Sequence, residues 1–176
     1  MMKPVIERQW LRRWIGGFLV SVLVAAPGMK AEGLAGTRVL VPGQLGLMVQ
    51  YALLGAKKRL EHAACAELLA EFHASDGLPL TAHVSLAPTD YLSTLWFVDA
   101  DDDRRCRTTA APIAFTAPGH PVIFVCGSHF ARKYLQNQRY AEILLIHEML
   151  HTAGLGENPP TSNQISGVAM TRCGSI

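Results

Sequence analysis

The sequence has few aromatic residues, few cysteines and no long hydrophobic run. Aromatic residues make up 7% of the 176 residues, and there are only four cysteines. The longest apolar run, from Trp14 to Ala26, is only about a dozen residues and is too short to cross a bilayer comfortably. No internal repeat and no low-complexity segment is present, so we expect a single domain with a sizeable core rather than a repeat protein.

The N-terminal segment has the composition of a secretory signal peptide. Lys3, Arg8, Arg12 and Arg13 precede the apolar run, and small residues follow it in "APGMKAEGLAG". We therefore expect residues 1–31 to be a signal peptide and residues 32–176 to be the mature chain, exported to the periplasm or the cell exterior. An uncleaved N-terminal anchor is the alternative. After cleavage we expect no stable membrane span.

The excess of basic residues belongs mostly to this segment. The whole chain has 16 Lys and Arg against 14 Asp and Glu, and residues 1–31 hold five of the basic residues and one of the acidic ones. The remaining 11 basic and 13 acidic residues give the mature chain a net charge of −2. No basic face remains to neutralise phosphates, so we expect no nucleic-acid partner.

The cysteines are even in number and form no CxxC pair. In an exported protein this predicts two disulfides, for which three connectivities are possible. Cys106 and Cys126 flank two short strand-like runs, so we favour a bridge between them, which leaves Cys65 to pair with Cys173.

The pattern of apolar residues predicts an α+β fold, with a small twisted mixed sheet packed on a central helix. We expect residues 32–45 to be loose and Lys57, Lys58, Arg59 and Glu61 to form a solvated stretch. The predicted strands are residues 95–100, 112–116 and 121–127, the last two forming a hairpin. The predicted helices are residues 46–73 (one or two helices, with Leu47, Tyr51 and Leu54 among the residues at helical intervals), 130–136, 138–153 and a last helix capped by Thr161 and Gln164.

Two histidines four residues apart lie in the apolar 138–153 helix. This spacing allows His147 and His151 to reach one ion, and places Glu148 beside them as a general base. A catalytic zinc site needs a third protein ligand. After Glu148 the only acidic side chain is Glu157, and no histidine follows His151, so Glu157 is the candidate unless Cys173 or the terminal carboxylate serves.

Other interpretations of the histidines remain open. A buried helix can carry histidines for packing and hydrogen bonding alone. His120 and His129 flank the predicted strand 121–127 and are alternative ligands, although isolated histidines of this kind are more typical of surface loops.

Residues 147–157 read H-E-x-x-H-x-x-G-x-x-E, which resembles the extended metzincin signature with glutamate in place of the third histidine. The segment ending in "GLGENPP" is also similar to that of small exported bacterial proteins. The resemblance implies a zincin-like domain over residues 32–176, with His147, His151 and Glu157 as zinc ligands, Glu148 as the base and Gly154 at a turn. It also implies a cleft-edge strand, for which "PVIFVCG" (121–127) is in the right order. The family's methionine turn is not expected, because Met170 falls in the last predicted helix.

The resulting functional prediction is an exported zinc metalloendopeptidase, a monomer that hydrolyses peptide or protein substrates with Glu148 as general base. The alternative is a catalytically inactive zincin-like module that binds a peptide or a cell-envelope partner. Glu148 distinguishes the two, because a protein that only binds does not need a carboxylate there.

Overall fold

The computed structural model describes residues 38–175. The predicted signal peptide, residues 1–31, therefore lies outside the described residues. Within residues 38–175, no helix is both long enough and apolar enough to cross a membrane.

The described residues form a four-stranded mixed sheet with the strand order β1-β2-β4-β3. Strands β1, β2 and β4 are parallel, and β3 pairs antiparallel with β4 at one edge. The strands are β1 Arg38–Leu40, β2 Trp96–Asp99, β3 Ala114–Phe115 and β4 Val122–Val125. The α+β class and the β3–β4 hairpin predicted from the sequence are confirmed.

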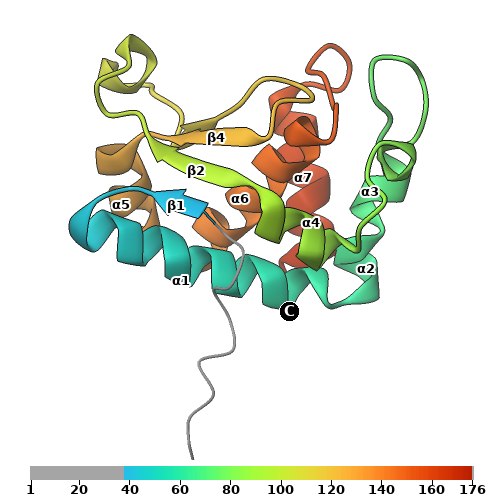
Figure 1. Cartoon of the computed structure of the whole chain (residues 1–176), viewed down its shortest axis with the longest axis horizontal. Helices are drawn as coiled ribbons and strands as arrows, with labels where there is room; N and C mark the ends of the chain where they lie inside the picture. The colour runs from blue at the N-terminus through green and yellow to red at the C-terminus, as the bar shows by residue number, and fades with distance from the viewer. Residues whose placement is uncertain (1–37, 176) are drawn as a thin grey trace, which may run out of the picture. The chain divides into compact units, whose positions relative to one another are not determined.

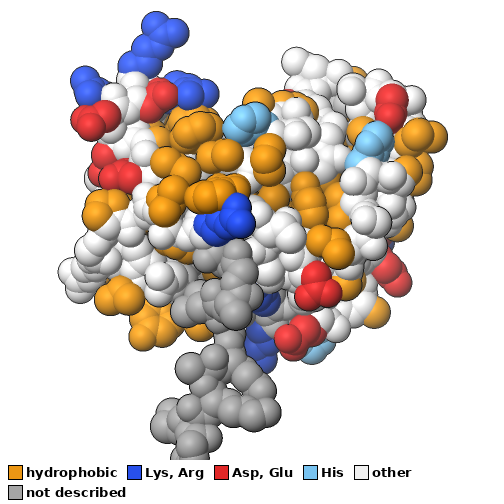
Figure 2. Space-filling model, in the orientation of Figure 1, with side chains coloured by type: hydrophobic (Ala, Val, Ile, Leu, Met, Phe, Trp, Pro, Cys, Tyr) orange, Lys and Arg blue, Asp and Glu red, His pale blue; other side chains and the backbone are white. Residues whose placement is uncertain are grey.

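The two faces of the sheet have different environments. Phe97 of β2 and Ile123 and Val125 of β4 are buried in the core, whereas the alternate residues are only partly buried. This alternation follows from the two-residue period of a strand. Hydrophobic side chains gather over the strands on the visible face of the molecule (Figure 2). On the less buried face, Phe124 stacks on Phe115.

Helices pack around the more buried face of the sheet and at its ends (Figure 1). Their bounds are α1 Gly43–Leu60, α2 Ala63–Ala66, α3 Leu68–Glu71, η1 Leu80–Ala82, α4 Pro88–Thr94, η2 Arg104–Arg107, α5 Gly127–Gln136, α6 Gln138–Thr152 and α7 Ser162–Cys173.

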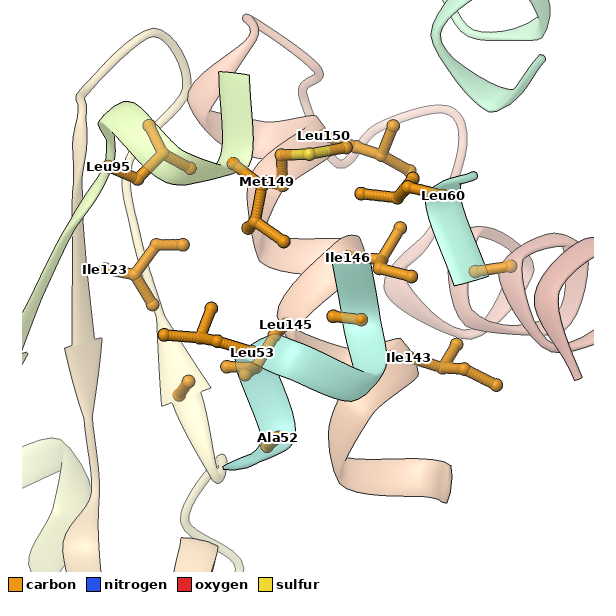
Figure 3. Packing of buried hydrophobic residues seen from close by; sticks show 14 of the residues in the cluster. Ala52, Leu53, Leu60, Leu95, Ile123, Ile143, Leu145, Ile146, Met149 and Leu150 are labelled. Carbon is orange, nitrogen blue, oxygen red and sulfur yellow. The ribbon is translucent and has the colours of Figure 1, made fainter. Parts of the chain in front are cut away.

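Helix α6 is the centre of the domain, as the sequence predicts. It contacts α1, α5, α7 and strands β3 and β4. Its side chains Leu145, Ile146 and Met149 are fully buried between the sheet and the surrounding helices (Figure 3). A helix that is apolar almost all round is stable only in such a position. Because α6 is buried on several sides, its polar residues near the C-terminus are held in a fixed environment.

The start of the domain is more ordered than we expected. Residues 32–45 were predicted to be loose, but Arg38–Leu40 pair in parallel with β2 and α1 begins at Gly43. Strand β1 has only three residues, of which only Val39 is partly buried, and its ladder with β2 holds it in place.

The residues whose helical spacing predicts α1 are not the ones that the helix buries. Leu47, Tyr51 and Leu54 are exposed, and the helix instead buries Val49, Ala52, Leu53, Ala56 and Leu60. Because α1 is apolar on more than one side, periodicity alone did not identify the face that meets α6. The region 46–73 also divides into three helices, α1 to α3, rather than one or two.

Arg59 is not part of a solvated basic stretch, which corrects a second prediction about α1. It is buried, and its guanidinium donates to the Glu142 carboxylate of α6 (2.7 Å) and to the carbonyl oxygen of Cys173 (2.7 Å). These bonds explain its burial, since a buried charge is tolerated only when it is paired. Arg59 therefore joins α1, α6 and α7.

Both predicted disulfides are present, Cys65–Cys173 and Cys106–Cys126. The first connects α2 with the C-terminal end of α7, and the second connects η2 with the end of β4. The predicted capping box is also present: the Thr161 hydroxyl accepts from the backbone of Gln164, whose side chain accepts from the Thr161 N–H. Helix α7 is thus fixed at both ends.

Candidate metal centre

Helix α6 places three polar side chains in the interior of the protein. Its N-cap is Asn137, whose side chain accepts a hydrogen bond from the backbone N–H of Tyr140, and it ends at Thr152. His147, Glu148 and His151 lie in its last turns and are almost fully buried. Side chains four residues apart stack along one face of a helix, so the two imidazole rings lie next to each other, with ring centroids 4.8 Å apart.

The structure brings both histidines together with Glu157, the third residue predicted from the sequence. The Nε2 atoms of His147 and His151 are 2.9 Å apart. Oε1 of Glu157 lies 3.2 Å from Nε2 of His151 and 3.9 Å from Nε2 of His147. These three residues can hold a metal ion, and in residues 38–175 they are the one cluster of three or more His, Cys, Asp or Glu with this property.

Gly154 directs the chain back toward the histidines. Its φ is +109°, a backbone conformation that side-chain-bearing residues rarely adopt. Its N–H donates to the carbonyl oxygen of His151 (2.9 Å), and Leu155 donates to the carbonyl oxygen of Leu150 (3.2 Å). The turn ends α6 and carries Glu157 over the two rings, where its side chain is half exposed (49%).

The second nitrogen of each histidine ring also has a partner. Nδ1 of His151 is 2.7 Å from the carbonyl oxygen of Leu155, in the turn that follows α6. Nδ1 of His147 is 3.1 Å from the hydroxyl oxygen of Ser166, in α7. Residues that orient metal-ligating histidines through their second nitrogen are a regular feature of metal sites.

Sequence reasoning missed Ser166. It lies 19 residues after His147 in a separate helix, and no spacing rule connects the two positions. The only sequence signal is the capping box at Thr161, which fixes the start of α7 and therefore which face of α7 turns toward α6.

The buried environment shifts two pKa values in ways that favour neutral side chains. Burial, together with the neighbouring His151, lowers the pKa of His147 to about 3. Burial is also the main cause that raises the pKa of Glu148 to about 8; the negative charge of Glu157 adds to this, and a hydrogen bond from the backbone of Thr116 opposes it. Both shifts favour the uncharged form of the side chain.

A cleft of about 710 Å³ opens onto the cluster. One wall is formed by β3 and the turn after it, and the other by the segment that carries Glu157. Glu148 and His151 lie on its floor, and the rest of its lining includes Pro112, Ala114, Phe115, Thr116, Pro118, Asn158 and Ser162. The Gly119 N–H donates to the carbonyl oxygen of His151 (2.9 Å), which joins the β3–β4 turn to the C-terminal end of α6.

The cleft-edge strand is β3 and not the segment 121–127 that the resemblance implied. Strand β4, Val122–Val125, lies between β2 and β3 and pairs with both, so its backbone is not available to a ligand. Strand β3 is the edge strand beside the cleft. Because β4 pairs with β2 on its other side, β3, the earlier strand of the hairpin, is left at the edge of the sheet.

The other candidate ligands do not belong to the cluster. His129 lies in α5, where its Nδ1 contacts the guanidinium of Arg132 (2.8 Å), and His120 is exposed in the β3–β4 turn. Cys173 is committed to its disulfide, and Ile176, which carries the terminal carboxylate, lies outside the described residues. Met170 lies in α7, as predicted.

Comparisons of the chain with protein-family models, with curated proteins and with solved structures found no match.

Proposed function

We propose that the protein is an exported, zinc-dependent metallopeptidase. In this proposal His147, His151 and Glu157 bind zinc, Glu148 is the general base, and a peptide substrate lies along β3 in the cleft.

The observation that carries the proposal is the convergence of three atoms that can each bind a metal ion, two imidazole nitrogens and one carboxylate oxygen. Nδ1 of His151 faces a carbonyl oxygen, which can only accept, so this nitrogen carries a proton and Nε2 is the nitrogen left to bind an ion. That Nε2 lies 2.9 Å from Nε2 of His147 and 3.2 Å from a carboxylate oxygen of Glu157. A cation bound at this point would be a partner for all three atoms at once.

The donor set is compatible with zinc. Two imidazole nitrogens and one carboxylate are a known shell of catalytic zinc, which keeps a further position open for water or substrate. The half-exposed Glu157 side chain and the adjoining cleft leave such a position accessible to solvent. A bound zinc would supply Lewis-acid activation of water and polarisation of a carbonyl oxygen.

Glu148 has the position and the environment of a general base. It lies on the cleft floor beside the ligands, and its carboxyl is almost fully buried. The burial that raises its pKa makes the group a stronger base than an exposed glutamate. It would accept a proton from the attacking water and return it to the leaving amine. Burying a carboxyl at this position is costly, and this is easier to explain for a catalyst than for a protein that only binds.

The cleft favours an extended peptide as substrate. Strand β3 has β4 on one side and lies at the edge of the sheet, so its outer backbone groups can pair with an added strand. The two disulfides and the absence of a membrane-spanning helix within residues 38–175 are compatible with export.

Metal analysis of the purified mature chain tests the site. We expect one equivalent of zinc in the wild type and a large loss in His147→Ala and Glu157→Ala, with Glu67→Gln as a control on an exposed glutamate outside the cluster, between α2 and α3. Stoichiometric zinc in Glu157→Ala would assign the third ligand elsewhere, and a wild type that takes up no metal would refute the site.

Hydrolysis of a library of quenched fluorescent peptides tests the activity. We expect cleavage by the zinc-loaded wild type and a loss of at least about a hundredfold in Glu148→Gln, because general-base catalysis contributes about this much or more. The variant should keep its zinc. If the wild type binds zinc but cleaves no peptide, and Glu148→Gln binds peptides equally well, the protein is a binding module instead.

A further inference from the structure

We infer that Ser166 is a positioning residue for His147, and that its hydroxyl allows the ring to change tautomer when metal binds. The inference rests on the proposed function, since it concerns the same metal site. It assigns to α7 a role that the H-E-x-x-H motif on α6 does not contain.

The contact itself is specific. Oγ of Ser166 lies 3.1 Å from Nδ1 of His147, a partly buried hydrogen bond between two helices. The neighbouring residues Ile165 and Ala169 are fully buried, so the face of α7 that carries Ser166 is packed against α6. The His147 ring cannot turn away from α7 without breaking this bond.

The two histidines have chemically different outer partners. His151 faces a carbonyl oxygen, which accepts only and therefore fixes the proton on Nδ1 in every state. His147 faces a hydroxyl, which can either donate or accept. The His151 tautomer is thus set by the backbone, whereas the His147 tautomer is free to change.

This difference matters because the metal-free and metal-bound sites need different tautomers of His147. Without metal, Nε2 of His147 carries the proton and donates a hydrogen bond to Nε2 of His151 (2.9 Å). The Ser166 hydroxyl then donates a hydrogen bond to Nδ1 of His147. With metal, Nε2 of His147 must present its lone pair. The ring then loses the Nε2 proton to solvent and takes a proton from solvent on Nδ1, so its charge is unchanged, and the Ser166 hydroxyl rotates to accept.

An apolar side chain at position 166 would leave Nδ1–H without a partner in the metal-bound state. A buried N–H group without an acceptor is costly, so the substitution would weaken metal binding. Helix α7 can impose the position of the hydroxyl because it is fixed by its capping box, by the Cys65–Cys173 disulfide and by the bond from Arg59 to the carbonyl oxygen of Cys173.

The test is zinc affinity, measured by competition with a chelator. We expect Ser166→Ala to bind zinc about ten times more weakly, which is the lower end of the effects seen for outer partners of metal ligands. Ser166→Thr keeps the hydroxyl and should stay within about threefold of the wild type. Thr171→Ala, which removes an exposed hydroxyl from the same helix, is the matched control and should bind as the wild type does.

Two further measurements separate positioning from a general loss of structure. Urea unfolding of the metal-free variants should show one cooperative transition for both, with Ser166→Ala less stable than Thr171→Ala by about 1 to 3 kcal/mol, because the buried Nδ1 of His147 loses its donor. Nitrogen-15 NMR of the wild type should show the His147 proton on Nε2 without zinc and on Nδ1 with zinc. This measurement needs no variant, so it holds even if Ser166→Ala does not fold.

The outcomes distinguish this inference from the proposed function. If the wild type binds zinc and Ser166→Ala binds equally tightly, or if the His147 proton stays on one nitrogen, Ser166 has no such role and the metallopeptidase proposal is unaffected. If the wild type binds no zinc, both are overturned.

Discussion

The disulfide between Cys65 and Cys173 closes a segment of chain that contains all three residues of the metal cluster. The two cysteines are 108 residues apart in the sequence, and their Cα atoms are 4.8 Å apart. The second disulfide, Cys106–Cys126, spans only 20 residues and lies on the sheet side of the domain. The long bridge therefore restricts the unfolded chain more, and it also holds the helix that carries Ser166.

Removing the long disulfide should cost more stability than removing the short one. In the chain-entropy description, closing about 100 residues stabilises by about 4.7 kcal/mol and closing about 20 residues by about 3 kcal/mol. We expect Cys65→Ala/Cys173→Ala to lose about 4 to 5 kcal/mol in urea unfolding, and Cys106→Ala/Cys126→Ala about 3 kcal/mol. Equal losses in the two double variants would contradict this ranking.

Glu148 should make the metal-free protein less stable as pH rises. Its pKa is raised from the ordinary value of 4.5 to about 8, so between these values the unfolded chain is ionised at Glu148 while the folded protein keeps the proton. The unfolded state then binds fewer protons, and stability falls with rising pH. Glu148→Gln removes the effect, so its advantage over the wild type should grow from pH 4.5 to 8, to on the order of 4 kcal/mol.

Added zinc should reduce this difference between the wild type and Glu148→Gln, because a nearby cation stabilises the carboxylate. The measurement is urea unfolding across the pH range, with and without a chelator. A difference between the two proteins that does not change with pH would mean that the Glu148 carboxyl is not desolvated in the folded state.

Gly154→Ala should weaken both the fold and the metal site. The positive φ of Gly154 is strained for alanine, and the new Cβ would lie 3.2 Å from Cβ of Ala74. A cost of about 1 to 3 kcal/mol is typical of such backbone strain. Zinc affinity should fall as well, since this turn positions Glu157. Gly156→Ala is the control, because its Cβ would meet nothing within 4 Å; equal effects of the two substitutions would exclude a special role for Gly154.

Leu53 and Leu54 are adjacent in α1 but should respond very differently to truncation. Leu53 is fully buried (0% exposed) against the core, whereas Leu54 is 38% exposed. We expect Leu53→Ala to lose about 2 to 5 kcal/mol, as for other buried leucines, and Leu54→Ala less than about 1 kcal/mol. Thermal unfolding checks the ranking. The reverse order would mean that α1 presents to α6 the face expected from the sequence.

The sequence was sufficient wherever local chemistry decides the structure. The capping box at Thr161, the β3–β4 hairpin and the buried α6 with its two histidines depend on residues within a few positions of one another. Gly154 also belongs to this class, because a helix that stops at a glycine turns in a restricted way. For this reason the three candidate ligands could be named before their geometry was known.

The features that the sequence did not predict correctly depend on contacts between distant segments. The buried face of α1 is decided by its fit against α6, where Gly55 allows the Glu142 side chain to approach closely. The identity of the cleft-edge strand depends on sheet order, which no local pattern records. Ser166 lies on a separate helix, and only the packing of α7 on α6 brings its hydroxyl to His147.

The hydrogen bond from the Gly119 N–H to the carbonyl oxygen of His151 has a mechanical consequence. It connects the β3–β4 turn, on the strand side of the cleft, to the helix that holds two of the three ligands, so we expect these parts to move together. Gly154 and Leu155 are also bonded to α6, so we expect any widening or narrowing of the cleft to be confined to residues 156–160, on its opposite side. Glu157 lies in this segment, so the wall of the cleft that can move also carries the third ligand. A substrate that displaces this wall would change the coordination of the ion directly.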